Sequence, residues 1–246
     1  MFGAPRSGTS LVQSVLAAHG RLFSIPGETG IFSTQNIFGR RHFGLSWAEN
    51  QTLFRESRDV VDFFDRGVRL LESRSEGRTF VEKTPQHVLR LPFLIRRFPR
   101  ARFIHVVRDG RDCFVSAKSR AGIPQASSAR RFAAYWKRCV EAPLRVEPHP
   151  RLLRVRYEDF VRAPQAELER MMRFLDLAVE DQQLDPARFG SHRRGGREEF
   201  RLLREPVSDR RVGRWRTELA LAERRVFERV AGRPLAGYGY LDEDAG

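Results

Sequence analysis

The sequence predicts an α/β protein whose central, mainly parallel β-sheet is flanked by helices. Three short apolar runs, rich in β-branched and aromatic residues, alternate with stretches of helical character: Thr79–Val81, Arg102–Val107 and Leu152–Val155. Strands that alternate with helices favour a parallel sheet. The chain has 246 residues, of which 41% are hydrophobic, and it shows no internal repeat or linker. We therefore expect a single domain over residues 1–246.

The first strand and the first helix are predicted at the N-terminus. Only Met1 and Phe2 precede Gly3, whereas a strand usually has about five residues, so we expect a first strand truncated at its start. The turn from Gly3 to Ser10 leads into four apolar positions that predict a helix: Leu11, Val12, Val15 and Leu16.

Two later segments have helical periodicity. Val61–Leu71 predicts an amphipathic helix that ends in a polar stretch. Four apolar residues fall at i, i+3, i+4 and i+7 and form one stripe: Leu168, Met171, Met172 and Leu175. The two methionines are thus expected in the core rather than at a cofactor. Pro92 predicts a break or kink in the segment that follows Thr84.

The charge of the chain favours anionic partners. Lys and Arg number 45 against 31 Asp and Glu, for a formal net charge of +14. The arginines are interspersed with acidic residues, and no zinc-finger, basic-zipper or aromatic RNA-binding signature is present. Nucleic acid is therefore an unfavoured partner.

The sequence also indicates a compartment. No run approaches the roughly 18 apolar residues of a membrane span, and the N-terminus lacks the regions of a signal peptide. We expect no membrane span and a cytoplasmic location. Cys113 and Cys139 are too few for a disulfide framework or a metal-ligand cluster, so we expect both to be buried.

The turn Gly3–Ser10 is a candidate anion-binding loop. Its glycines have the spacing of the phosphate loop G-x-x-x-x-G-K-[ST], but Thr9 stands at the lysine position. Gly8 permits the backbone conformation of an anion nest, and the following helix N-terminus favours negative charge. An ordinary helix start is the alternative interpretation.

A second candidate follows the strand that ends at Val107. Ligands of open parallel sheets bind beyond the carboxyl ends of strands, where Arg108 is expected, and a guanidinium binds phosphate in bidentate fashion. Ser116 comes about two helical turns later. A surface ion pair between Arg108 and Asp109 is the alternative interpretation.

Five motifs together resemble those of sulfotransferases that depend on 3′-phosphoadenosine 5′-phosphosulfate (PAPS). In chain order they are Pro5–Thr9, Glu82–Pro85, Arg108–Asp112 with Ser116, Arg156–Phe160 and Val212–Trp215. The resemblance spans nearly the whole chain. Within the superfamily it looks most like the bacterial and tyrosylprotein-type branch, which has Gly rather than Pro after the Arg-Asp pair.

The resemblance implies a three-layer, P-loop-like fold and a role for each motif. The loop residues Pro5, Arg6, Ser7, Gly8, Thr9 and Ser10 would hold the 5′-phosphosulfate. Arg108 and Ser116 would hold the 3′-phosphate, with Tyr157 near the adenine and with Gly213, Arg214 and Trp215 closing over the nucleotide. Adenosine 3′,5′-bisphosphate (PAP) would be the product, and no metal would be required. Tyr157 as a core aromatic and Trp215 as a helix anchor are the structural alternatives.

The resemblance also implies catalytic residues. Lys83 and Arg6 would neutralise charge on the departing phosphate. Glu28, in a turn rich in Pro and Gly, resembles the glutamate base of tyrosylprotein sulfotransferases. The steroid and phenol branch uses a histidine, and His87 is nearest to Lys83. We rank Glu28 above His87 because Thr84–Pro85 predicts a strand-to-helix boundary between His87 and Lys83.

Two other functions compete with sulfuryl transfer. One is a P-loop nucleotide or metabolite kinase, against which the missing lysine argues. The other is a non-catalytic basic module that binds nucleotides or nucleic acid. In the favoured reading, acceptor specificity falls to loops expected at Phe32–Trp47, Gly122–Ser128 and Ser191–Arg204, and a small-molecule, glycan, lipid or tyrosyl acceptor is compatible with them. The stretch Ser191–Glu199 reads as a solvated loop or as a lid over an anionic ligand.

Overall fold

The computed structural model of the chain describes residues 1–33, 37–119, 122–189 and 205–241, and within these ranges the strands form two parallel sheets. The larger sheet has the order β1-β4-β5, from β1 (Phe2–Gly3), β4 (Phe103–Val107) and β5 (Leu152–Arg156). The smaller sheet pairs β2 (Leu22–Phe23) with β3 (Thr79–Phe80). The three strands predicted from apolar runs are thus confirmed.

The two sheets meet at the start of the chain. The ammonium of Met1 donates a hydrogen bond of 2.6 Å to the carbonyl of Glu82, two residues beyond β3. On its other side, β1 pairs with β4, with Phe2 opposite His105 and Gly3 opposite Val106. The carboxyl ends of β1, β4 and β5 therefore lie at one edge of the larger sheet, because both of its pairings are parallel.

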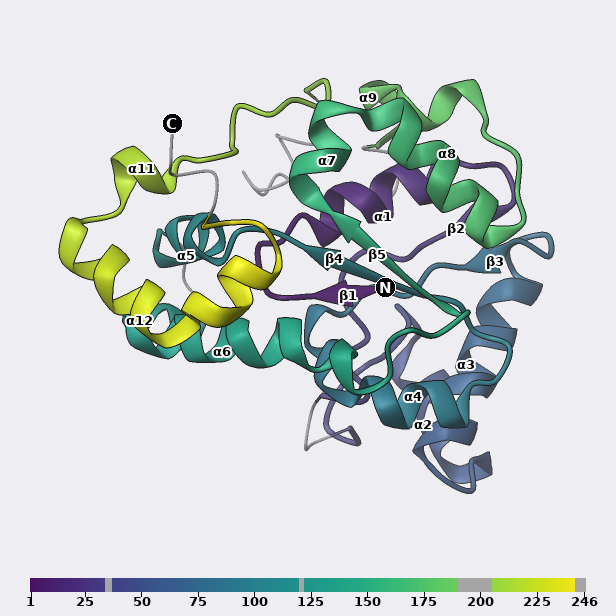
Figure 1. Cartoon of the computed structure of the whole chain (residues 1–246). Helices are drawn as coiled ribbons and strands as arrows, with labels where there is room; N and C mark the ends of the chain where they lie inside the picture. Colours follow the sequence, from purple (N-terminus) through teal and green to yellow (C-terminus); the bar gives the residue numbers. More distant parts are fainter. Residues whose placement is uncertain (34–36, 120–121, 190–204, 242–246) are drawn as a thin grey trace.

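Helices cover both faces of the larger sheet, so the fold has three layers (Figure 1). One core lies between the larger sheet and the helices on its first face. It contains Phe103 and Val107 of β4 and residues of four helices: α4 (Leu91–Arg97), α5 (Gly110–Lys118), α6 (Ala129–Glu141) and α12 (Leu221–Gly237). A second core contains Ile104 and Val106 and packs against the other side: α1 (Thr9–Ala17), α7 (Tyr157–Arg162) and α8 (Pro164–Leu175). Alternate residues of one strand thus enter opposite cores, as the period of a strand requires.

A third apolar cluster lies beside the smaller sheet. It joins β2 to α2 (Trp47–Glu56) and α3 (Val60–Ser73) through seven buried residues: Phe23, Ile31, Phe43, Leu45, Leu53, Phe63 and Leu71. The remaining elements are short: η1 (Pro85–Arg90), η2 (Pro124–Ser127), η3 (Pro143–Arg145), η4 (Asp181–Leu184), α9 (Pro186–Phe189) and α11 (Trp215–Glu218).

Most helical predictions agree with the structure. The amphipathic segment Val61–Leu71 lies within α3, and Met171 and Met172 are buried in the core on α8. Pro92 marks the change from the 3₁₀ helix η1 to α4, where its missing N–H falls in the first turn and costs nothing. Cys113 and Cys139 are buried and free, as expected.

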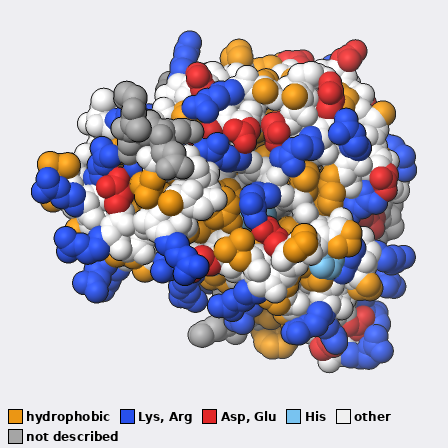
Figure 2. Space-filling model, in the orientation of Figure 1, with side chains coloured by type: hydrophobic (Ala, Val, Ile, Leu, Met, Phe, Trp, Pro, Cys, Tyr) orange, Lys and Arg blue, Asp and Glu red, His pale blue; other side chains and the backbone are white. Residues whose placement is uncertain are grey.

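The surface is basic but mixed. On the face seen in Figure 2, lysine and arginine side chains are spread widely, with acidic side chains among them, rather than gathered into one block. Such a distribution lacks the continuous basic stripe that is typical of a nucleic-acid interface. No helix within the described ranges combines the length and the apolar character that crossing a membrane needs.

The packing of α5 against α6 and α12 predicts the effect of one small substitution. A Cβ atom at Gly110 would lie 2.5 Å from the ring of Trp136 and 2.7 Å from that of Phe227. We expect Gly110→Ala to lower the free energy of unfolding by about 1–3 kcal/mol, because a full core cannot absorb a methyl group. Urea denaturation measures this change.

Gly232→Ala is the matched control, since a Cβ there meets nothing within 4 Å and the residue lies inside α12. It should leave stability unchanged or raise it by about 0.5–1 kcal/mol. Equal stability of Gly110→Ala and wild type would contradict the close packing of these helices.

Candidate active site

The loop between β1 and α1 has the backbone of an anion nest. Arg6 and Gly8 both adopt left-handed conformations, with φ of 69° and 95°. Gly8 precedes α1, whose first turn contains no acidic residue, and the amides of Thr9 and Ser10 come before the first intrahelical hydrogen bond. These amides point outward from the helix N-terminus, where the helix dipole favours an anion.

Tyr157 packs directly on this loop. The residue begins α7 just beyond β5 and is buried. A Cβ atom at position 8 would collide with its ring, so Gly8 is required for the close approach as well as for its positive φ. The guanidinium of Arg108 lies over the Tyr157 ring, 4.4 Å from its centre. Burial raises the pKa of Tyr157, while the charge of Arg108 opposes that rise.

Arg108 and Ser116 both contact Arg6. Arg108 lies one residue beyond β4, and its Nη1 donates to the carbonyl of Arg6 at 3.3 Å. The Nε of Arg6 donates to the Oγ of Ser116 at 3.1 Å. The structure therefore brings together residues from two predicted motifs, the loop and the Arg108–Ser116 pair. Arg108 is not in a surface ion pair with Asp109, which instead bonds to Arg111.

Two buried polar atoms at this place have no hydrogen-bond partner within the described residues. They are the Oγ of Ser7 and the Nε of Arg108. Buried donors are almost always paired, so orphaned donors beside a nest of backbone amides indicate that a ligand completes the site. Both groups can donate a hydrogen bond, which fits the phosphate oxygens of a nucleotide.

The segment Arg211–Trp215 lies against Arg108. The amides of Gly213 and Trp215 donate to Asp112, at 2.8 Å and 2.9 Å. Arg214 forms a two-pronged contact with Glu218, at 2.6 Å and 2.7 Å. The ring of Trp215 is 2% exposed and packs on the guanidinium of Arg111, so this side chain anchors the segment in the core.

Arg211 is a further arginine at this place, and it lies outside the five motifs of the sequence. Its carbonyl accepts a hydrogen bond of 2.5 Å from Arg108. Burial lowers the pKa of Arg211, and the neighbouring charges of Arg214 and Arg108 add to that effect. Two other guanidinium groups thus lie close to that of Arg211, and an anion bound there would offset their charge. The pair Arg210-Arg211 immediately before the Val212–Trp215 motif was the available signal.

Lys83 and Glu28 form the second part of the site. The Nζ of Lys83 lies 2.7 Å from the Oε1 of Glu28, and the lysine is 6% exposed while the glutamate is 38% exposed. Lys83 follows β3 in the smaller sheet, as Arg6 follows β1 and Arg108 follows β4 in the larger one, so each of the three lies beyond the carboxyl end of a strand. Ligands of such folds bind beyond these ends.

A buried carboxylate holds the Glu28 loop in place. Glu82 accepts hydrogen bonds from the hydroxyls of Thr29 at 2.8 Å and Thr84 at 2.6 Å, and its Oε2 lies 3.2 Å from the Nδ1 of His87. Burial alone would raise the pKa of Glu82, but the hydrogen bonds from His87 and Thr84 and the charge of the Met1 ammonium lower it to about 2.

His87 is fully engaged by this network. Its Nδ1 faces Glu82, and its Nε2 accepts the amide N–H of Phe32 at 3.2 Å. A general base needs a free lone pair aimed at the substrate, so the geometry favours Glu28 over His87 for that role.

The loops expected to determine specificity are described only in part. Phe43 is buried, whereas Phe38 is 70% exposed and Trp47 is 50% exposed. The stretch Ser191–Arg204, which contains the segment expected to be a solvated loop or a lid, lies outside the described residues.

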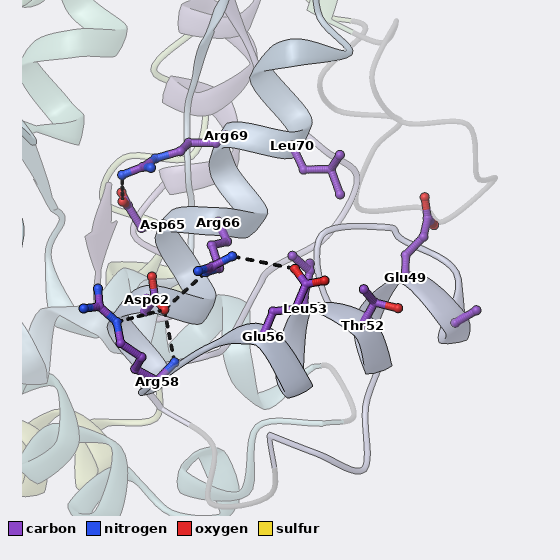
Figure 3. Close-up of a pocket in the computed structure, with 11 residues that line it drawn as sticks. Glu49, Thr52, Leu53, Glu56, Arg58, Asp62, Asp65, Arg66, Arg69 and Leu70 are labelled. Carbon is purple, nitrogen blue, oxygen red and sulfur yellow. Dashed lines mark hydrogen bonds and ion pairs between the residues drawn. The ribbon is translucent and has the colours of Figure 1, made fainter.

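A separate cavity of about 740 Å³ lies between α2 and α3. Its charged side chains are already paired, for example Arg66 with Asp62 and Arg69 with Asp65 (Figure 3). None of the predicted site residues lines it. The cavity is therefore distinct from the nest and from the Lys83–Glu28 pair.

The chain is similar in sequence to known proteins. A family model described as "Sulfotransferase family" matches residues 1–181. A "Putative protein-tyrosine sulfotransferase" of Caenorhabditis briggsae is 27% identical over 188 residues, which cover 74% of this chain and 66% of that protein. "Protein-tyrosine sulfotransferase 1" of Danio rerio is 28% identical over 190 residues, covering 73% of this chain and 53% of that protein. The chain thus spans about half to two thirds of the length of these relatives.

The fold also has solved counterparts. The sulfotransferase domain of the olefin synthase of Synechococcus PCC 7002 superposes with a TM-score of 0.67 at 20% identity. The superposition covers 94% of this chain and 92% of that one. This similarity confirms the predicted α/β fold.

The lowered pKa of Glu82 predicts how stability depends on pH. The carboxylate stabilises the folded state above its ordinary pKa of 4.5, and that contribution is lost as the pH falls toward about 2. We expect Glu82→Gln to lower the free energy of unfolding by about 3 kcal/mol at pH 7, with the difference from wild type vanishing near pH 2.

Urea denaturation at a series of pH values measures this effect. Glu169→Gln, at an exposed position of α8, is the control and should change stability by less than about 0.5 kcal/mol. A Glu82→Gln deficit that persists unchanged at low pH would show that the carboxylate is not the source of the stabilisation.

Proposed function

The chain belongs to the sulfotransferase family, and on that premise we propose that it transfers a sulfuryl group from PAPS to a hydroxyl acceptor, or less readily to an amine. The observation that carries this proposal is the 2.7 Å contact between Lys83, just beyond β3, and Glu28. A cation for the leaving group and a carboxylate for the acceptor proton are the two groups that such a transfer needs.

In the proposed complex, the nest binds the 5′ end of the donor. The amides at the start of α1 and the hydroxyls of Ser7, Thr9 and Ser10 would donate to the phosphosulfate, with Pro5, Arg6 and Gly8 shaping the loop. The orphaned Oγ of Ser7 supports this assignment, because a phosphosulfate oxygen would satisfy it.

The 3′-phosphate would lie against Arg108 and Ser116. The lowered pKa of Arg211 beside Arg214 and Arg108 supports this assignment, since a dianion would offset the positive charge around Arg211. Tyr157 would contact the adenine through its ring edge, and the segment that contains Gly213, Arg214 and Trp215 would close over the nucleotide.

The reaction would be an in-line displacement at sulfur. The acceptor oxygen forms a bond to sulfur while the bond from sulfur to the bridging phosphate oxygen breaks, and PAP leaves with the electron pair. Glu28 takes the proton of the acceptor hydroxyl, and Lys83 donates a hydrogen bond to the bridging oxygen as its charge grows. Arg6 would add positive charge at the same oxygen. The acceleration would therefore come from positioning and from preorganised charge, as in phosphoryl transfer.

The acceptor is proposed at the level of its chemical class. The tyrosine sulfotransferases among the relatives support a tyrosyl or other phenolic hydroxyl, and a small-molecule, glycan or lipid alcohol fits the same step. Exposed aromatic side chains at Phe38 and Trp47 would suit an acceptor with a flat or apolar part. A kinase is not favoured, because Thr9 replaces the lysine that such enzymes use at the phosphates.

Nucleotide titration tests the donor class. We expect wild type to bind PAP without magnesium and more tightly than adenosine 5′-monophosphate or magnesium ATP. Arg108→Ala should weaken PAP binding about 30-fold or more, because a buried guanidinium paired with a phosphate is lost. Isothermal calorimetry measures each affinity.

The control for this titration is Arg69→Ala, which removes an exposed arginine of α3 and should bind PAP as wild type does. A preference of the wild-type protein for magnesium ATP would move it to the kinases.

Two substitutions test the chemical step once an acceptor screen has given a measurable rate of PAP release. Glu28→Gln should lower turnover by about 100-fold or more while PAP still binds, because the base is removed and the shape is kept. Lys83→Ala should depress turnover far more than PAP affinity, because its contact forms as the leaving group departs.

Glu56→Gln, at an exposed carboxylate of α2, is the control and should turn over normally. Near-normal turnover of Glu28→Gln would remove it as the base. Equal losses of turnover and affinity in Lys83→Ala would remove that lysine from the chemical step.

A further inference from the structure

Asp112 is a buried carboxylate that touches two separate parts of the site. It lies in the first turn of α5 and is 1% exposed. Its Oδ1 accepts the amide N–H of Trp215 at 2.9 Å, and its Oδ2 accepts that of Gly213 at 2.8 Å. The same Oδ2 lies 3.6 Å from the Nη2 of Arg108, four residues earlier in the chain.

The segment that Asp112 holds is otherwise irregular backbone. Gly213 has a φ of 76°, and α11 begins only at Trp215. Figure 1 shows α11 beside α5, and contacts between the two helices agree with that placement. Two amides of the segment donate hydrogen bonds to the carboxylate of Asp112 on α5. The position of the segment relative to Arg108 therefore depends on Asp112.

Arg108 is held from the same side. Its Nη2 donates to the carbonyl of Arg211 and faces Asp112, while its Nε has no partner within the described residues. Arg108, Asp112 and the segment Arg211–Trp215 therefore form one connected unit. Displacing any part of this unit changes the direction in which the guanidinium points.

We propose that Asp112 is a positioning residue for recognition of the 3′-phosphate, which it secures by fixing Arg108 and the segment Arg211–Trp215 to each other. This inference rests on the proposed function, because it takes the 3′-phosphate of the donor as the ligand of Arg108. Asp112 itself does not touch the ligand. It carries the same sign of charge as the phosphate, yet the site needs it.

Coulomb repulsion and positioning make opposite predictions for Asp112. Removing a negative charge 3.6 Å from Arg108 would by Coulomb's law alone strengthen the binding of an anion there. Removing an acceptor of two amide hydrogen bonds would release the segment and weaken binding. The direction of the change in affinity therefore decides between a merely nearby charge and a positioning residue.

The test is calorimetric titration of Asp112→Asn with PAP and with adenosine 5′-monophosphate. The asparagine keeps the shape but turns one acceptor into a donor that faces an amide N–H. We expect PAP to bind about tenfold more weakly than to wild type, and adenosine 5′-monophosphate to change by less than about twofold, so that selectivity for the 3′-phosphate falls. Unchanged or tighter PAP binding would overturn the proposal, as would equal weakening of both nucleotides.

Glu228→Gln is the matched control. Glu228 lies on α12 and pairs with Arg111 at 2.8 Å, so the variant also removes a carboxylate from the ion pairs of this region, but not one that touches the segment Arg211–Trp215. Its selectivity between the two nucleotides should equal that of wild type. A loss like that of Asp112→Asn would assign the effect to general destabilisation and overturn the proposal.

A second measurement needs no variant. Hydrogen exchange of the folded wild-type protein should show protected amides at Gly213 and Trp215, because both donate to a buried carboxylate. Rapid exchange at both amides would overturn the anchor itself. Failure of wild type to bind PAP would instead overturn the proposed function and its 3′-phosphate site, while the exchange result would still report on the anchor.

Discussion

The site depends on the fixed position of β4. This strand is buried along its whole length and pairs with β1 on one edge and with β5 on the other. Its carboxyl end delivers Arg108, which contacts the carbonyls of Arg6 and Arg211, the ring of Tyr157 and the carboxylate of Asp112. Segments from four regions of the chain thus take their positions from one guanidinium. A shift of the strand would move all of these contacts together.

Buried charged side chains explain why so many hydrogen bonds and ion pairs lie beside β4. Arg111 is almost fully buried, and its guanidinium bonds to Asp109, to Glu228 and to the carbonyl of Tyr240. Burial raises the pKa of Asp109, an effect that its bonds to Arg111 oppose. Desolvated charges are tolerated only when they are paired, so the network ties α5, α12 and the C-terminal residues into one body.

The sequence predicted the helices and strands from the spacing of apolar residues. It did not predict which residues far apart in the chain are in contact. Strand positions and the helices near Val61 and Leu168 follow from local apolar patterns, and the resemblance implied the loop and Lys83. The pairing of Glu28 with Lys83 joins residues 55 positions apart, and no local pattern encodes it. The two-amide anchor at Asp112 is equally non-local. Burial of Trp215 was open in the sequence, because an aromatic residue can serve equally as a lid or as an anchor.

The ion pair between Lys83 and Glu28 has a kinetic consequence for the proposed reaction. While the lysine holds Oε1 of the carboxylate, only Oε2 is left for a hydroxyl that arrives first. An anionic donor would compete for the lysine and free the whole carboxylate, so activation of the acceptor would follow donor binding. In the proposed reaction, a contact of 2.7 Å within the free protein would thereby favour binding of the donor before the acceptor.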